Sequence, residues 1–192
     1  MPDRPDDLAP LVPRLRAGDR AALAEAFRAL HGPLVRYGRS LTGDPAEAED
    51  AVQDAFLAVW RRRADLDPDR PVRALLYAAV RNRLLNRARD AARRRDLHAL
   101  IDPPARPDTP DDRAHAALLG ARLRGWLSEL PDRQREAFRL ARFDGLSYAE
   151  VAGVMGCSVK TVENHVGRAL RHLRDRLRAV DPDALPSQSA PS

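Results

Sequence analysis

The sequence has a single cysteine, a single lysine, few aromatic residues and no long apolar run. Because Cys157 is alone, an intramolecular disulfide and a zinc cluster built on several cysteines are both excluded. Aromatic residues make up only 5% of the chain, and the Val, Ile and Thr runs typical of strands are scarce. The acidic start of the chain lacks the basic-then-apolar order of a signal peptide, and no segment has the length of a membrane span. We therefore expect a helical protein of the cytoplasm without membrane insertion.

Arginine is abundant instead. Lys and Arg total 33 against 28 Asp and Glu, which gives a net charge of +5, and Lys160 is the sole lysine. The planar guanidinium suits phosphate groups and base edges, so this composition favours a polyanionic partner. A GC-rich genome would explain the arginine bias equally well, and only the clustering of arginines on particular helices can decide between the two explanations.

Prolines divide the chain into two helical parts. The segment 96–113 contains four prolines among Asp and Arg and predicts a flexible linker, and the Pro- and Ser-containing segment 181–192 predicts a disordered tail. The apolar spacing on either side of the linker is helical. The sequence thus predicts an all-α protein with two small helical domains, 1–95 and 114–180, of which the second is a helix-turn-helix domain.

Local signals mark the helix ends. In the first domain we expect helices over 18–42 with a kink at Gly32-Pro33, over 46–63, and from residue 71 or 72 to 95. Asp44 is the expected N-cap of the middle helix, with Glu47 placed to close a capping box. In the second domain we expect helices starting near residue 112 and at Pro131, then a helix over 147–155 that begins with a capping box of Ser147 and Glu150, and a last helix over 159–179.

The last two helices have the pattern of a helix-turn-helix motif, whose second helix enters the major groove of DNA. The turn begins at Gly156, and the second helix has an expected apolar stripe of Val162, Val166, Leu170 and Leu173. Its outward face carries side chains that can contact bases or phosphates, namely Lys160, Thr161, Glu163, Asn164, Arg168 and Arg171. The polar outer face of any three-helix domain is the alternative explanation.

The helix over 72–95 holds eight arginines against one acid, Asp90, a density that favours an anionic ligand such as phosphate. Four side chains fall on one face, Asn82, Asn86, Arg89 and Arg93, beside an expected apolar stripe of Leu76, Val80, Leu84 and Ala88. Amides beside arginines are suited to reading bases. A solvated run of charge is the alternative.

The helix over 46–63 is acidic in its first half, where Glu47, Glu49, Asp50 and Asp54 accompany Gln53. Carboxylates repel phosphate, so this face suits a basic protein partner better than DNA. A well-capped solvent-exposed face explains the acids nearly as well, and the residues alone leave this point open.

Catalytic patterns are absent from the sequence. The five histidines are scattered without metal-ligand spacing, and neither a nucleophile-base arrangement nor a glycine-rich phosphate loop accompanies them. We expect no enzyme activity, no metal and no cofactor.

Four segments in this order, 44–60, 75–83, 130–138, and 145–152 with 161–166, closely resemble the extracytoplasmic-function (group 4) sigma factors of bacterial RNA polymerase. The likeness covers roughly residues 18–95 and 114–178. Two departures stand out: Leu75 and Leu76 lie where a Trp is common, and Glu163-Asn164-His165 replaces the commoner Arg-Ser-Arg type of recognition helix.

This resemblance implies a division of labour. Residues 1–95 would be a region 2-like domain, whose acidic helix docks on the clamp helices of the polymerase beta-prime subunit through Asp50, Gln53 and Asp54, and whose next helix melts and reads the minus-10 element with Asn82 and Asn86. Residues 114–180 would be a region 4-like domain that binds the minus-35 element, with Arg168 at a DNA-contacting position, and touches the beta flap. The implied partners are core RNA polymerase, promoter DNA and an anti-sigma factor.

Two other functions remain as alternatives at this point. One is a helix-turn-helix transcriptional regulator that acts without docking on polymerase, because the pattern of 163–165 is shared with response-regulator output domains. The other is a helical adaptor that binds an acidic protein through its arginine face.

Overall fold

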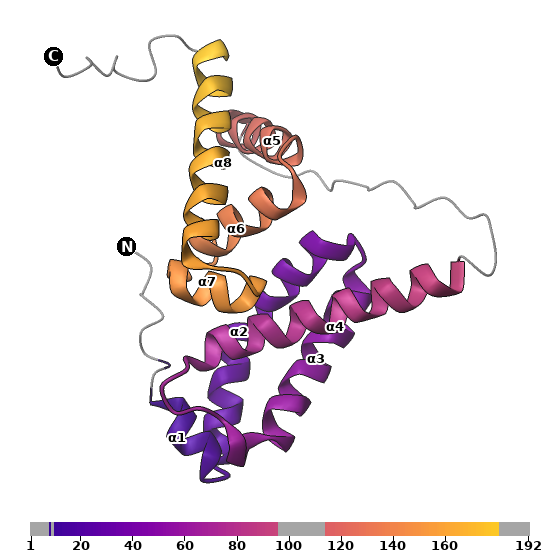
Figure 1. The fold of residues 1–192 in the computed structure, drawn as a ribbon, viewed down its shortest axis with the longest axis vertical. Coiled ribbons are helices and arrows are strands. Elements are labelled where there is room, and N and C mark those ends of the chain that lie inside the picture. Colours follow the sequence, from indigo (N-terminus) through magenta and orange to yellow (C-terminus); the bar gives the residue numbers. More distant parts are fainter. Residues whose placement is uncertain (1–7, 9, 96–113, 181–192) are drawn as a thin grey trace, which may run out of the picture. The chain divides into compact units, whose positions relative to one another are not determined.

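The computed structural model describes residue 8, residues 10–95 and residues 114–180, with the side chains of 92–95 and 114–119 left out of that description. Every regular element in these ranges is a helix, which confirms the predicted all-α class (Figure 1). The elements are α1 (Leu11–Arg16), α2 (Arg20–Thr42), α3 (Pro45–Arg61), the 3-10 turn η2 (Arg63–Asp65), α4 (Val72–Arg95), α5 (Ala114–Ser128), α6 (Asp132–Arg142), α7 (Tyr148–Met155) and α8 (Val159–Val180). The chain divides into two compact units, 1–107 and 108–192, and the predicted linker and tail lie outside the described residues.

In the first unit, α2, α3 and α4 pack pairwise around one core. Buried side chains come from each helix, including Leu34 of α2, Val52 of α3 and Leu76 of α4. The rings of Tyr37 and Tyr77 meet at 5.1 Å between centroids, which links α2 to α4. Apolar burial on this scale is the main stabilising term of a small helical domain, because helices of this length are marginal alone.

The close approach of α2 and α3 depends on a glycine. A Cβ atom built on Gly38 would lie 3.0 Å from Cβ of Ala48 and 3.3 Å from its Cα, closer than side chains normally approach. A small residue on each helix therefore sets the distance between them.

Caps define the ends of these helices. Asp19 is the N-cap of α2 and accepts hydrogen bonds from the amides of Ala21 and Ala22 at 2.8 and 3.3 Å. A hydrogen bond from Arg14 holds the pKa of Asp19 below its ordinary value. Asp44 caps α3 as predicted, but its own amide donates to Oγ1 of Thr42 at 3.2 Å, a role that the sequence had assigned to Glu47.

Helix α1 was not predicted. It is only six residues long and lies between Pro10 and Ala17, with a further proline at position 13. Leu11, Val12 and Leu15 are nevertheless buried, and α1 packs against α2 and η2. Tertiary burial thus stabilises a helix whose local sequence gives little sign of it.

In the second unit, α8 packs against α5, α6 and α7. Ser147 and Glu150 form the predicted capping box at the start of α7, which ends in Gly156 with a positive φ of 64°. The buried line of α8 is Val162, Val166 and Ala169. The expected stripe was wrong beyond Val166, because Leu170 and Leu173 are only half-buried and the small Ala169 faces the core instead.

Candidate nucleic-acid interface

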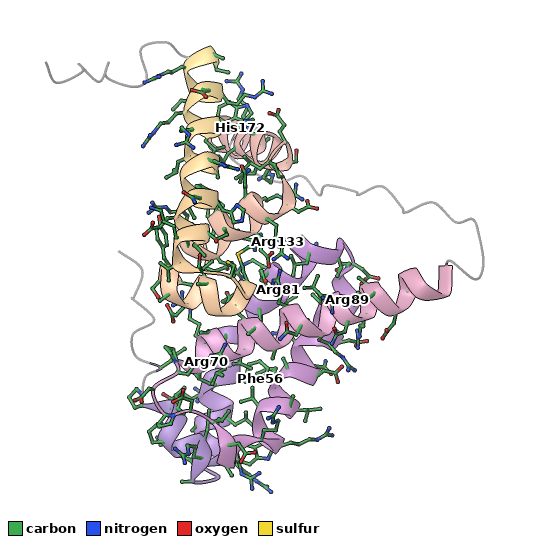
Figure 2. All side chains as sticks on the ribbon, in the orientation of Figure 1. Phe56, Arg70, Arg81, Arg89, Arg133 and His172 are labelled. Atoms are coloured by element: carbon green, nitrogen blue, oxygen red, sulfur yellow. The ribbon has the colours of Figure 1, made fainter. Side chains whose placement is uncertain are left out.

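The amide face of α4 is exposed because the opposite side of the helix packs against the core. Leu76, Val80 and Leu84 are buried against the core, while Asn82, Asn86 and Arg89 are exposed. Figure 2 labels Arg89 on α4. Spacings of four and three residues place these three side chains on one side of the helix. Oδ1 of Asn86 accepts a hydrogen bond from Nη1 of Arg89 at 3.3 Å, so two of the predicted residues are in direct contact. Arg93 lies in the last turns of α4, and its side chain is outside the described part.

The predicted apolar stripe of α4 ends one turn early. Ala88 is exposed, and only the first three positions of the stripe are in the core. The C-terminal part of α4 extends past the helices against which its first half packs, as Figure 1 shows.

The eight arginines of α4 differ in their surroundings. Arg73 and Arg81 are buried, a placement that their sequence positions did not indicate. Arg83 and Arg87 point to α3, where Nη2 of each lies 2.6 and 3.1 Å from Oδ2 of Asp54. Of the arginines whose side chains are described, Arg89 is the one on the exposed amide face.

The acidic face of α3 lies beside these arginines. Asp50 is 68% exposed and Gln53 is exposed, whereas Asp54 is 38% exposed because it contacts α4. Glu49 belongs to another contact, in which its Oε1 lies 2.6 Å from Nε2 of His31 on α2. The structure thus brings the three predicted polymerase-binding residues to one surface.

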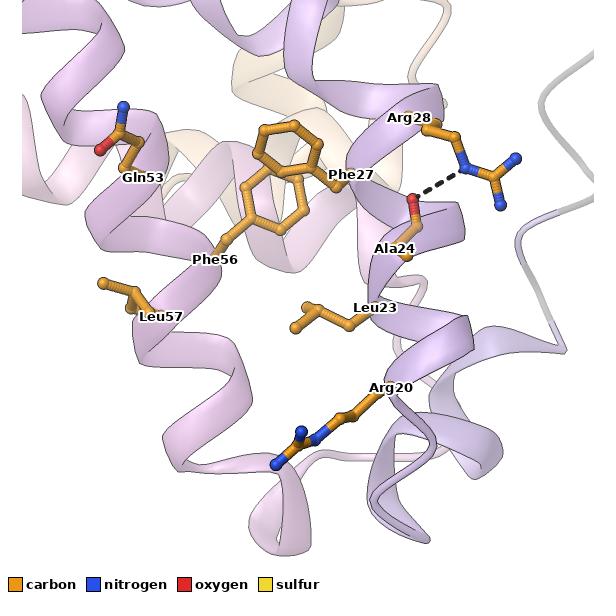
Figure 3. Close-up of a pocket in the computed structure, with 8 residues that line it drawn as sticks. All are labelled: Arg20, Leu23, Ala24, Phe27, Arg28, Gln53, Phe56 and Leu57. Atoms are coloured by element: carbon orange, nitrogen blue, oxygen red, sulfur yellow. Dashed lines mark hydrogen bonds between the residues drawn. The ribbon is translucent and has the colours of Figure 1, made fainter.

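An apolar groove between α2 and α3 borders this acidic face (Figure 3). Leu23 and Phe27 line it from α2, Phe56 and Leu57 from α3, and Gln53 and Leu57 also line the hollow that contains Asp50 and Asp54. Phe27 is 41% and Leu57 51% exposed, large values for apolar side chains. Phe27 has a regular helical spacing with Leu23, Leu30 and Leu34 in the sequence, a pattern that does not indicate its exposure, so this groove was missed.

The second predicted DNA-binding face occupies the first half of α8. Lys160, Glu163, Asn164, Arg168 and Arg171 are exposed, and Thr161 is half-buried. Ser158 precedes the helix and its Oγ accepts a hydrogen bond from the amide of Thr161 at 3.1 Å, which fixes the start of α8. Nζ of Lys160 lies 3.1 Å from Oε2 of Glu163, so these two side chains pair along the helix.

The far end of α8 is held separately. Nε of Arg176 donates to Oε2 of Glu129 at 2.8 Å, and Nε2 of His172 lies 3.1 Å from the same oxygen. These contacts join the second half of α8 to Glu129, the residue that follows α5.

The described residues offer neither a metal site nor a membrane span. No cluster of His, Cys, Asp and Glu there could hold a metal ion. None of the described helices combines the length and the apolar character that crossing a membrane requires.

Two family models match the chain, Sigma-70 region 2 over residues 26–94 and Sigma-70 region 4 over residues 121–173. The ECF RNA polymerase sigma factor SigL of Mycobacterium tuberculosis is 34% identical over 171 residues, which span 85% of this chain and 96% of SigL. The chain is an extracytoplasmic-function sigma factor. Another relative of this sigma factor is the RNA polymerase sigma factor CnrH of Cupriavidus metallidurans, 32% identical over 187 residues, with 88% and 93% of the two chains covered.

Solved structures agree with this assignment. CnrH in complex with the cytosolic domain of CnrY has a TM-score of 0.63 to this sigma factor at 32% identity, over 91% of this chain and 99% of that one. The sigma factor RpoE in complex with the anti-sigma factor NepR from Bartonella quintana has a TM-score of 0.64 at 24% identity, over 82% and 97% of the two chains, a likeness of fold. The sequence prediction of a sigma factor is confirmed, and the match to region 2 weighs against a helix-turn-helix regulator without polymerase docking.

Proposed function

We propose that this sigma factor docks on core RNA polymerase through the acidic face of α3 and the adjoining groove, and reads one promoter element with each of its two units. The observation that supports this most is the adjacency, on α3 and α4 of one small unit, of a carboxylate face and an amide face. The carboxylate face suits a basic protein partner, and the amide face suits DNA bases. The sigma factor acts by binding alone, and the chemistry of RNA synthesis belongs to the polymerase in the cytoplasm.

The proposed polymerase contacts are Asp50, Gln53 and Asp54 in residues 1–95, with the beta-prime clamp helices as the partner. Stable protein interfaces combine an apolar centre with a polar rim. The groove supplies the apolar part, since Phe27 and Leu57 are exposed there, and the carboxylates beside it supply the rim. An anti-sigma factor that covered the same surface would block docking.

The proposed minus-10 contacts are Asn82, Asn86, Arg89 and Arg93. Asn can form two hydrogen bonds with adenine, and guanidinium groups bind phosphate or stack on bases. Bases released by local melting would be captured by this face, and their capture offsets the loss of stacking in the duplex.

The proposed minus-35 contacts lie in residues 114–180, where the outer face of α8 would enter the major groove and the same unit would touch the beta flap. They are Lys160, Thr161, Glu163, Asn164, Arg168 and Arg171. Once one unit is bound to a promoter, binding of the other unit to the same promoter is intramolecular, so two weak DNA-binding sites together give strong binding.

The test is reconstitution with purified bacterial core polymerase and run-off transcription on a library of promoter fragments. We expect this sigma factor to bind the core enzyme and to direct initiation at a subset of fragments that share two upstream elements. A chain that neither binds the core enzyme nor directs a start on any template would refute the proposal.

A further inference from the structure

Two arginines of α4 pair with carboxylates of α3. Nη2 of Arg83 lies 2.6 Å from Oδ2 of Asp54, and Nη2 of Arg87 lies 3.1 Å from the same oxygen. Nη1 of Arg87 is also 3.9 Å from Oδ2 of Asp50. Two guanidinium groups thus meet two carboxylates, and their charges cancel.

The position of these arginines connects two surfaces. Arg83 and Arg87 follow Asn82 and Asn86 by one residue, so they form the next row around α4, about 100° from the amide face. On their other side they line the same hollow as Asp50, Gln53 and Asp54. This row, which we call the bridging arginines, therefore borders both the proposed polymerase-docking surface and the proposed promoter face.

We propose that the bridging arginines Arg83 and Arg87 bind DNA phosphates in the polymerase-bound sigma factor, and that Asp54 and Asp50 withhold them from DNA in the free chain. This inference rests on the proposed function, because it takes α3 as the docking surface and α4 as the promoter face. A basic group of the polymerase pairs with the carboxylates on docking. The guanidinium groups then turn to the phosphates beside the bases that Asn82 and Asn86 read.

The exposure of the pairs makes this exchange feasible. The side chains of Asp54 and Arg83 are 38% and 51% exposed, so water and an incoming partner reach them. Ion pairs between exposed side chains contribute little to stability, so their replacement costs little. The packing of α3 on α4 does not depend on them, because Val52, Phe56, Val80 and Leu84 are buried in the same unit.

The salt dependence of binding distinguishes bridging arginines from arginines that only join two helices. Each neutralised phosphate contributes about 0.9 to the slope of log K against log salt on duplex DNA and about 0.7 on single strands. For the double variant Arg83→Gln/Arg87→Gln, we expect the slope for promoter binding by holoenzyme to fall by about 1.4 to 1.8. The slope for non-specific DNA binding by the free chain should stay unchanged. The control is Arg36→Gln/Arg39→Gln, which removes the same charge from exposed positions of α2 and should leave both slopes as they are.

A second variant tests the withholding in the free chain itself. Asp54→Asn breaks both short pairs, so the slope for non-specific DNA binding by the free chain should rise by up to about 1.8. Glu47→Gln makes the same change of charge on α3, at a half-buried position, and should not alter the slope. This measurement remains decisive if the double variant loses helicity by circular dichroism.

The results of these experiments distinguish a failure of the bridging-arginine proposal from a failure of the proposed function. If holoenzyme with Arg83→Gln/Arg87→Gln keeps the wild-type slope while the wild-type chain still directs initiation, the bridging arginines do not bind phosphate and this inference is wrong. An unchanged slope for free Asp54→Asn would equally overturn it. If the wild-type chain does not bind the core enzyme at all, the proposed function fails first and this inference with it.

Discussion

Replacing Asn86 by alanine should impair promoter opening without affecting the fold or docking. Asn86 is exposed in the middle of α4, and its Oδ1 accepts a hydrogen bond from Arg89, which orients the amide on the proposed promoter face. A side chain that makes two hydrogen bonds to a base contributes about 1–3 kcal/mol of discrimination. Since about 1.4 kcal/mol is a factor of ten, the variant should bind a single-stranded minus-10 oligonucleotide about 5- to 140-fold more weakly as holoenzyme.

The design of this experiment excludes a simple loss of structure. Alanine is a better helix former than asparagine, so α4 should be at least as stable in the variant. The assay is titration of the oligonucleotide into holoenzyme, with permanganate reactivity of the duplex promoter as the measure of opening. Asn164→Ala removes the same group from α8 and should weaken initial duplex binding with no effect on the single strand. Wild-type opening by Asn86→Ala holoenzyme, or a loss of core binding, would refute the assignment of the amide face.

Three further predictions concern packing, docking and the second unit. Gly38→Ala should destabilise the first unit by about 1–3 kcal/mol in thermal melts, because its Cβ would meet Ala48 at 3.0 Å. The control Gly125→Ala in α5 has no such neighbour within 4 Å and should instead stabilise that helix by about 0.5–1 kcal/mol; equal losses of stability in the two variants would contradict the close approach of α2 and α3. Leu57→Asp should weaken core binding at least tenfold in a pull-down titration with little change in melting temperature, since Leu57 is 51% exposed; unaltered affinity would remove the groove from the docking surface. Arg168→Ala should make the free energy of binding to duplex promoters less favourable by about 1–3 kcal/mol in competition assays. If Arg168 contacts a base, the variant should also lose sequence preference at one upstream base pair, whereas a phosphate contact would leave that preference intact. Undiminished promoter binding would place Arg168 outside the interface.

Helix boundaries were largely predictable, because caps are local. Asp44 and Ser147 accept amide hydrogen bonds at the positions expected, and Gly43 and Gly156 end their helices with positive φ. Helix α1 was not predictable in this way, since its stability comes from burial of Leu11 and Leu15 rather than from local signals. Caps depend on neighbours in sequence, whereas burial depends on neighbours in space.

The limits of the apolar stripes have the same origin. Periodicity identifies the side of a helix that faces a core, but it does not show where the packed neighbours end. Phe27 and Ala88 both continue a regular stripe and both are exposed, one in the groove beside α3 and the other where α4 extends past its partners. The exposed Phe27 is the more informative of the two errors, because an apolar side chain that is periodic and yet exposed indicates an interface rather than a core.

The arginines of α4 show why charge counting along one helix overstates a site. Eight arginines against one acid favour an anionic ligand only if no compensating charge comes from elsewhere in the chain. Asp54 lies about thirty positions earlier in the sequence and yet pairs with Arg83 and Arg87, and Arg73 and Arg81 are buried within the unit. The cationic surface that remains on the described part of α4 is therefore far smaller than its composition suggests. The proposed exchange therefore predicts that this sigma factor binds DNA weakly until its acidic face is occupied, and that promoter recognition is confined to the polymerase-bound form.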